Sequence, residues 1–178
     1  MNVDVSVVLE GSIRQIGYVV RGLDAAVRSW CALGVGPWFT VWDYEMKGCL
    51  SRGELCEPTM SVAFANSGPM QIELLQQHDD GPSIFREFLD AHGEGYNQLA
   101  WWATNFDAVM RRAEAAGWPV VFSNMDAEIR FALYELDTKI SPIVEVTELN
   151  ANSRGVFDMV RSAALDWDGV TEPVRSVF

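Results

Sequence analysis

Two stretches of the chain, IRQIGYVVRGLDAAVRSWCALG (13–34) and YNQLAWWATNFDAVMRRAEAAG (96–117), align without a gap when the sequence is shifted by 83 residues. Gln15 falls on Gln98, and an aspartate, an arginine and a glycine further along also coincide. In both stretches a short apolar strand leads into a polar turn and an amphipathic helix. The carboxylate near the helix start suits the helix dipole, and the glycine suits its end. The chain therefore contains a repeat, and each copy begins with a strand followed by a helix.

Three further candidate strands follow the helix in each copy, which gives both copies the order βαβββ. The strands are expected at 37–44, 59–66 and 70–76 in the first copy and at 118–124, 127–136 and 142–148 in the second. The last strands also correspond, because MQIELLQ lies on PIVEVTE and places Glu73 on Glu145 at an offset of 72 residues. Each copy thus carries one glutamine on its first strand and one glutamate on its last.

Strand alternation groups these polar residues on one face of the sheet. Gln15 points away from Ile16 and Tyr18, and Gln98 likewise points away from its two neighbours. Glu73 and Glu145 each stand between apolar residues that face the other way. If the helices cover one sheet face, all four polar residues are expected on the other.

Composition limits the class of protein. With 178 residues and 49% hydrophobic content the chain can form one good core, and no linker divides it. The 13 Lys and Arg against 25 Asp and Glu give a formal charge of −12, which makes nucleic acid an unsuitable partner. The three cysteines form no CxxC pair, and no segment has the length or composition of a membrane span or signal peptide. We expect a soluble cytoplasmic protein.

Two segments outside the repeat are also expected to be helical. The first, about 82–92, connects the copies and has an apolar stripe. The second lies in the tail 150–178 and carries Phe157, Val160 and Ala164 on one side. The tail helix is expected to cap the core or to pair with a second subunit. The segment 47–58, with Cys49 and Cys56, is expected to be a loop or strand edge.

Tandem βαβββ modules with one polar residue on the first and last strand of each resemble the vicinal oxygen chelate superfamily. This superfamily includes glyoxalase I, methylmalonyl-CoA epimerase, bleomycin-resistance proteins and extradiol dioxygenases. The resemblance covers residues 12–149 and is carried by IRQIGYVVRGLDAAVRSWCALGVGPW, MQIELLQ, GEGYNQLAWWATNFDAVMRRAEAAG and IVEVTE. It implies an α+β fold in which two tandem βαβββ modules form a curled mixed sheet around a central cup, followed by a C-terminal helix. It also implies a homodimer.

The implied domain organisation is one domain over 1–178. Module one covers about 12–76, the connecting helix about 82–92, module two about 95–149, and the tail 150–178.

The resemblance further implies where a divalent metal would be held. Ligands in the superfamily typically come from the first and fourth strands, which here carry Gln15, Glu73, Gln98 and Glu145. The epimerase-like pattern has histidines on the two first strands, where this chain has glutamines. Glutamine lacks the imidazole nitrogen that suits zinc, nickel, cobalt or iron, so these residues would form an all-oxygen site suited to Mg²⁺ or Mn²⁺. We expect a member that has lost its metal and uses no cofactor.

Without a metal, two buried carboxylates still provide acid–base chemistry, because desolvation raises their pKa values and proximity separates them. We expect Glu73 and Glu145 to transfer protons, with the Gln15 and Gln98 amides as orienting groups. The leading hypothesis is an isomerase, epimerase or lyase acting on a small hydrophobic or aromatic carbonyl compound. The epimerase branch likewise moves a proton at the carbon next to a carbonyl. Two alternatives stay open: a metal-dependent enzyme with the all-oxygen site, and a non-catalytic protein that sequesters a small molecule.

Aromatic residues are candidates for the substrate pocket. Trp38, Trp42 and Trp102 are expected to line it, although ordinary core packing is an equal alternative for each. His92, just before the second copy, is the candidate histidine, with a solvated loop position as the competing interpretation.

Overall fold

The computed structural model describes residues 7–138 and 141–177. The first module contains β1 (Gln15–Val19), α1 (Leu23–Ala32), β2 (Trp38–Glu45), β3 (Cys49–Ser51), β4 (Glu54–Cys56), β5 (Thr59–Ser67) and β6 (Met70–Gln77). The helix α2 (Ile84–His92) connects it to the second module, which contains β7 (Gly95–Ala103), α3 (Phe106–Ala115), β8 (Val120–Asn124), β9 (Phe131–Glu135) and β10 (Ile143–Glu148). The C-terminal segment forms α4 (Ala151–Leu165) and β11 (Val174–Ser176).

The predicted βαβββ order is confirmed in both copies, with three differences. The segment 47–58 forms the short β3–β4 hairpin, which pairs with β8 of the second module. The strand expected at 127–136 begins only at Phe131, because the preceding residues form a loop. The tail adds β11, which pairs with β2.

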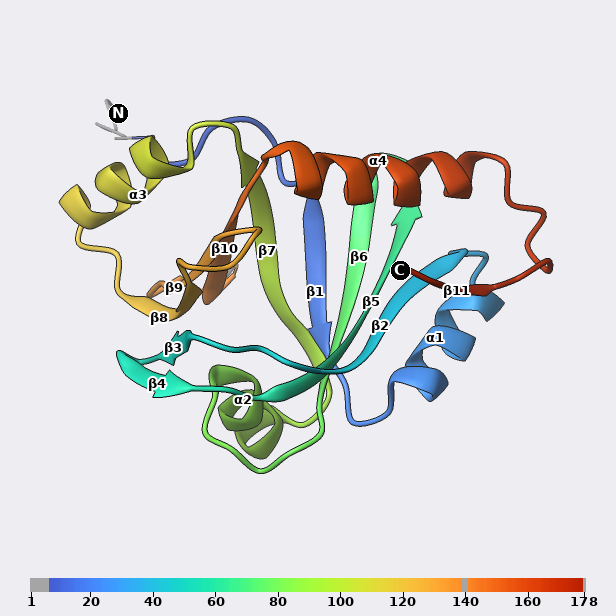
Figure 1. Ribbon diagram of the computed structural model, residues 1–178, viewed down its shortest axis with the longest axis horizontal. Coiled ribbons are helices and arrows are strands. Elements are labelled where there is room, and N and C mark those ends of the chain that lie inside the picture. Colours follow the sequence, from blue (N-terminus) through green and yellow to red (C-terminus); the bar gives the residue numbers. More distant parts are fainter. Residues whose placement is uncertain (1–6, 139–140, 178) are drawn as a thin grey trace.

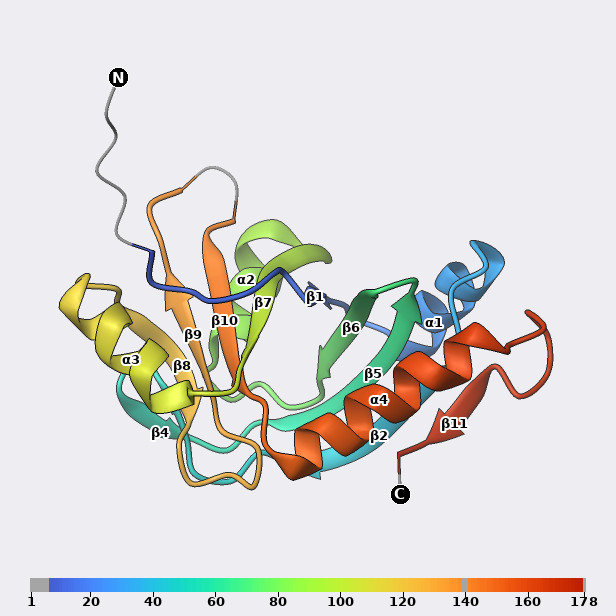
Figure 2. The same cartoon turned by 90° about the horizontal axis from the view of Figure 1, so that it is seen from above.

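The strands form one mixed sheet in the order β11-β2-β5-β6-β1-β7-β10-β9-β8-β3-β4. The two modules meet where β1 and β7 run antiparallel at the centre of the sheet. Each of these strands also pairs in parallel with the last strand of its own module, β1 with β6 and β7 with β10. Figures 1 and 2 show the resulting curvature, with the outer strands of the two modules bending toward the same side.

Helices α1 and α3 cover the outer face of this curved sheet. Under α1, Ile16 and Tyr18 pack beside Val20 with the helix residues Leu23 and Val27, as alternation predicts. A matching cluster lies under α3. The inner face carries the four polar residues of the repeat, surrounded by apolar side chains. Helix α2 packs against a third apolar cluster that combines residues of both modules, and α4 crosses β1, β6 and β5 in Figure 1 and packs against β5.

Within residues 7–138 and 141–177, no helix combines the length and apolar character that crossing a membrane requires.

The central β1–β7 pair is not symmetric, although it joins two copies of one repeat. Gly17 stands opposite Gln98, whose side chain lies directly over it, and a Cβ added to Gly17 would be 2.5 Å from the Gln98 Cδ. The repeat places Ala100 at the position equivalent to Gly17, opposite Gln15. Ala100 carries a methyl group at the corresponding place, and Gln98 is the glutamine whose amide reaches carboxyl groups of both modules.

Replacing Gly17 with alanine is expected to destabilise the fold by about 1–3 kcal/mol, because the added methyl group overpacks a filled site. Urea unfolding measures this change. Gly155→Ala is the matched control, since Gly155 lies exposed in α4 with open space around it, and roughly 0.5–1 kcal/mol of stabilisation is expected there. Unchanged stability of Gly17→Ala would contradict the close approach of Gln98.

Candidate functional site

The four polar residues of the repeat lie together on the inner face of the sheet. Gln15 and Gln98 are 2% and 1% exposed, and Glu73 and Glu145 are each 8% exposed. All four line a cavity of about 660 Å³. The shared face predicted from strand alternation is therefore present, because each residue lies on a central strand whose other face is covered by a helix.

Gln98 is the centre of this group. Its Nε2 atom donates hydrogen bonds to Glu73 Oε2 at 3.2 Å and to Glu145 Oε2 at 3.0 Å. Thr147, two residues beyond Glu145 on the same strand face, donates from Oγ1 to Glu145 Oε1 at 2.6 Å. One amide thus holds the carboxyl groups of the two modules beside each other, over Gly17.

Gln15 does not take the equivalent position. Its Nε2 atom donates to Gln71 Oε1 at 2.9 Å, and Gln71 is fully buried. Gln71 and Thr147 were not among the predicted site residues. Alternation was the signal that could have found them, because each lies two residues from one of the glutamates on the same face.

Burial controls the protonation of the two carboxyl groups. The pKa of Glu73 is raised well above its usual range by burial and then by the charge of Glu145, against the hydrogen bond from Gln98. Burial also raises the pKa of Glu145, while the hydrogen bonds from Thr147 and Gln98 oppose that rise. Glu145 has the better support for a negative charge, so a proton held by the pair is favoured on Glu73.

The walls around this polar floor are largely apolar. Strands β5, β6 and β9 contribute Val62, Phe64, Leu75, Phe131 and Leu133, α2 contributes Phe85, and the C-terminal segment adds Val156, Phe157 and Val177. Tyr44, Glu45, Lys47, Asn124 and Glu128 are the other polar side chains of the lining. The cavity therefore combines a small acid and amide cluster with a hydrophobic enclosure, as ligand sites commonly do.

The predicted aromatic contacts are not part of this lining. Trp38 is fully buried under α1 and donates from Nε1 to Val35 O at 2.9 Å. Trp42 is 43% exposed, and His92 is exposed as the last residue of α2. Trp102 stacks on Phe157 with ring centroids 4.0 Å apart, so it supports the wall from behind. Phenylalanines and Tyr44 provide the aromatic surface instead.

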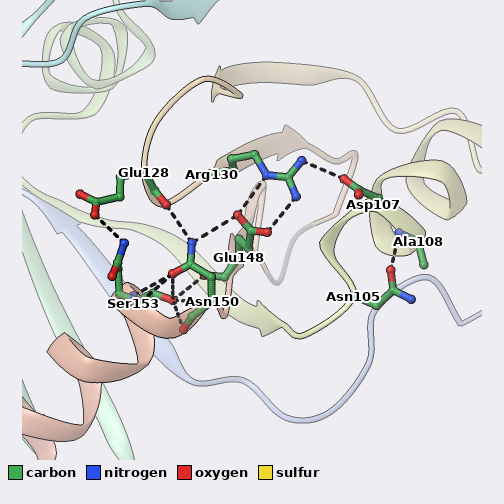
Figure 3. Close-up of polar contacts among 9 residues, drawn as sticks. Asn105, Asp107, Ala108, Glu128, Arg130, Glu148, Asn150 and Ser153 are labelled. Atoms are coloured by element: carbon green, nitrogen blue, oxygen red, sulfur yellow. Dashed lines mark hydrogen bonds and ion pairs between the residues drawn. The ribbon is translucent and has the colours of Figure 1, made fainter.

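A polar network fixes the loop that forms part of the cavity rim (Figure 3). Arg130 donates to both carboxylate oxygens of Glu148, at 2.8 and 3.0 Å, and to Asp107 at 2.9 Å. Asn150, the N-cap of α4, donates from Nδ2 to Glu128 O at 2.8 Å. The loop before β9 is therefore attached to the start of the helix that covers the cavity.

The four residues fit a divalent metal poorly. The Gln98 Nε2 group, which is a donor and not a ligand, lies between the two carboxylates that would have to share the ion. Gln15 is turned toward Gln71. In the described part of the chain, no three His, Cys, Asp or Glu side chains gather in a way that could hold a metal ion.

Comparisons with known proteins agree with this architecture. The fold is similar to methylmalonyl-CoA epimerase from Mycobacterium tuberculosis, with 21% identity, 80% of this chain and 91% of that chain covered, and a TM-score of 0.55. A hypothetical protein from Bacillus halodurans has 17% identity, covers 78% of this chain and 94% of its own, and has a TM-score of 0.61.

Methylmalonyl-CoA epimerase from Streptomyces coelicolor, in complex with 2-nitronate-propionyl-CoA, has 19% identity, coverages of 78% and 97%, and a TM-score of 0.53. No curated protein sequence matches the chain. Residues 14–133 match the model of the Glyoxalase/Bleomycin resistance protein/Dioxygenase superfamily, and the chain therefore belongs to that superfamily.

Proposed function

We propose that the protein is an isomerase, epimerase or lyase that transfers a proton at the carbon next to a carbonyl group, without a metal. The observation that carries the proposal is the pair of buried carboxyl groups, Glu73 and Glu145, bridged by one amide at the floor of an apolar cavity. Carboxyl groups with raised pKa values are suited to general acid and base catalysis near neutral pH. The resemblance to the epimerase branch implies the same type of reaction.

The two carboxyl groups have different roles in this proposal. Glu145, whose charge is supported by Thr147 and Gln98, removes the proton from the α carbon, and the electron pair of that C–H bond moves toward the carbonyl oxygen. Protonated Glu73, which lies beside Glu145 on the same cavity floor, returns a proton at a conjugated carbon on the same face of the substrate. Gln98 keeps the two groups in place, and Gln15 shapes the floor. Proton exchange with water then restores the starting state.

The lining supports a small, uncharged, hydrophobic or aromatic substrate. Among the described residues that line the cavity, Lys47 is the one cationic side chain, and it pairs with Glu45 at 3.4 Å in an exposed position. A substrate carboxylate at the floor would meet Glu73 and Glu145 with no cation to offset the repulsion. The homodimer implied by the resemblance stays a prediction.

Exchange of the α hydrogens of apolar ketones with deuterium tests the reaction directly. A panel from bicyclic to tetracyclic ketones, including α-tetralone, is followed by proton NMR in D₂O. We expect catalysed exchange by the wild-type protein and a loss of about 10²–10⁴-fold in Glu145→Gln, which removes the general base. Glu114→Gln, on the exposed face of α3, is the control and should retain the full rate. Tight ketone binding without any exchange would favour the sequestering alternative.

The raised pKa of Glu73 also predicts the pH dependence of stability. A carboxyl group whose pKa in the folded protein lies above its usual 4.5 binds a proton more tightly in the folded than in the unfolded state. Its contribution to the stability of the fold is therefore full at low pH and declines as the pH rises through the raised pKa. Glu73→Gln removes this decline. Its stability relative to wild type is expected to improve from about pH 5 to about pH 8, by at most about 1.4 kcal/mol for each pH unit because one proton is involved.

Denaturant unfolding at both pH values measures this difference. Glu114→Gln should show the same pH dependence as the wild type. A Glu73→Gln protein whose stability relative to wild type does not change with pH would contradict a raised pKa.

Metal independence has its own test. Protein purified without chelator or affinity metal is analysed for bound elements and then titrated calorimetrically with manganese, magnesium, zinc and nickel. We expect no stoichiometric binding. The double variant Gln15→His, Gln98→His should gain zinc or nickel binding, because it restores imidazole ligands and removes the amide between the carboxylates. Stoichiometric manganese or magnesium that disappears in Glu73→Ala would instead support the all-oxygen metal site.

A further inference from the structure

Strand β2 contains a bulge that changes which residues face the cavity. Val41 pairs with Val62 and Tyr44 pairs with Met60, so three steps along β2 correspond to two steps along β5. Regular alternation would turn Asp43 inward and Tyr44 outward. With one extra residue in the strand, Val41 and Tyr44 both line the cavity.

The bulge is held by a polar cluster on the outer side of the sheet. Asp43 has a φ of 47°, an uncommon backbone conformation for a residue other than glycine. Its backbone N–H donates to the Oγ atom of fully buried Ser61 at 2.9 Å. His78 Nε2 lies 2.7 Å from the same Oγ atom and 3.1 Å from Asp43 Oδ1. These contacts keep the chain in the conformation that directs Tyr44 inward.

Tyr44 presents an uncommitted hydroxyl group to the cavity. Within the described part of the chain its hydroxyl has no hydrogen-bond partner, whereas the Thr147 hydroxyl, the other one in the lining, donates to Glu145. The amides of Gln98, Gln15 and Asn124 already donate to protein acceptors. Tyr44 is therefore the hydroxyl donor that remains for a ligand.

The surroundings keep this hydroxyl protonated. Burial raises the pKa of Tyr44, and the charge of Glu73 raises it further, followed by smaller effects that include Glu145. A phenol that does not ionise can donate a hydrogen bond, and the same carboxyl groups that perform the proposed proton transfer are close enough to influence it. Donor and proton-transfer groups thus share one cavity.

We propose that Tyr44 is a further catalytic residue, whose hydroxyl donates a hydrogen bond to the carbonyl oxygen of the substrate. This inference rests on the proposed proton transfer. As Glu145 takes the α proton, negative charge collects on the carbonyl oxygen, and the Tyr44 O–H stabilises it without giving up its proton. When a proton returns to carbon, the charge leaves the oxygen and Tyr44 is unchanged. Asp43, Ser61 and His78 are positioning residues for this donor.

The carbonyl stretching frequency of a bound ketone tests the hydrogen bond independently of turnover. The probe is a ¹³C-carbonyl-labelled ketone that binds the wild-type protein saturably, chosen from the panel that includes α-tetralone. In Tyr44→Phe the infrared band should move back toward its position in an apolar solvent, and the deuterium exchange rate should fall by roughly 10²–10³-fold. Binding of tetralin, which has no carbonyl group, should not change.

Two further variants complete the test. Tyr134→Phe removes a hydroxyl on β9 that contacts Met110 and does not line the cavity, so band and rate should stay at the wild-type values. Ser61→Ala removes the acceptor of the Asp43 N–H, and its band should move part of the way toward that of Tyr44→Phe, which loss of stability alone would not cause.

The outcomes separate this inference from the proposed function. If the wild-type protein catalyses exchange and Tyr44→Phe has the same carbonyl band and the same exchange rate, the role of Tyr44 is overturned and the proton transfer is retained. If the carbonyl band shifts in Tyr44→Phe but the wild-type protein catalyses no exchange, the proton transfer is overturned and Tyr44 is retained as a hydrogen-bond donor. Failure of every ketone to bind would overturn both.

Discussion

The burial of two carboxyl groups beside each other is the constraint on which the rest of the structure depends. Such a pair is costly in an apolar interior unless it is protonated, hydrogen-bonded or both. Here a single amide, from Gln98, donates to both carboxyl groups, and the residue below it has no side chain. The junction of the two modules therefore includes a polar contact between β6, β7 and β10, supported by the bare backbone of β1 at Gly17.

This contact also explains why the two copies of the repeat have diverged. The copies provide equivalent glutamines and equivalent glutamates, but one central amide is enough to bridge the pair. Gln98 fills that place because it faces a glycine, and Gln15, facing Ala100, binds Gln71 instead. An arrangement that begins with internal symmetry thus becomes a site with distinct environments for Glu73 and Glu145, which is what separate acid and base roles require.

The sequence predicts the modules and the floor of the site well, because both depend on local periodicity. The 83-residue offset and strand alternation place Gln15, Glu73, Gln98 and Glu145 on one face. The residues of the cavity walls depend on features that leave no periodic pattern in the sequence. One extra residue in β2 turns Tyr44 inward, and nothing in the letters WDY indicates a bulge. Trp38 lies on the helix-covered face of its strand. The tail helix was predicted, but its contribution of Phe157 to the cavity depends on tertiary docking.

The position of α4 in the chain has a consequence for how the site is assembled. Both modules precede α4, so the strands that carry the carboxyl groups can pair before the helix that covers them has docked. Until then the cavity lacks the cover of Val156 and Phe157, so Glu73 and Glu145 are more open to water. Docking of α4 removes this hydration, with the contacts of Asn150 to the rim loop forming at the same stage. The burial that raises the pKa values of the pair is thus complete only when α4 is in place.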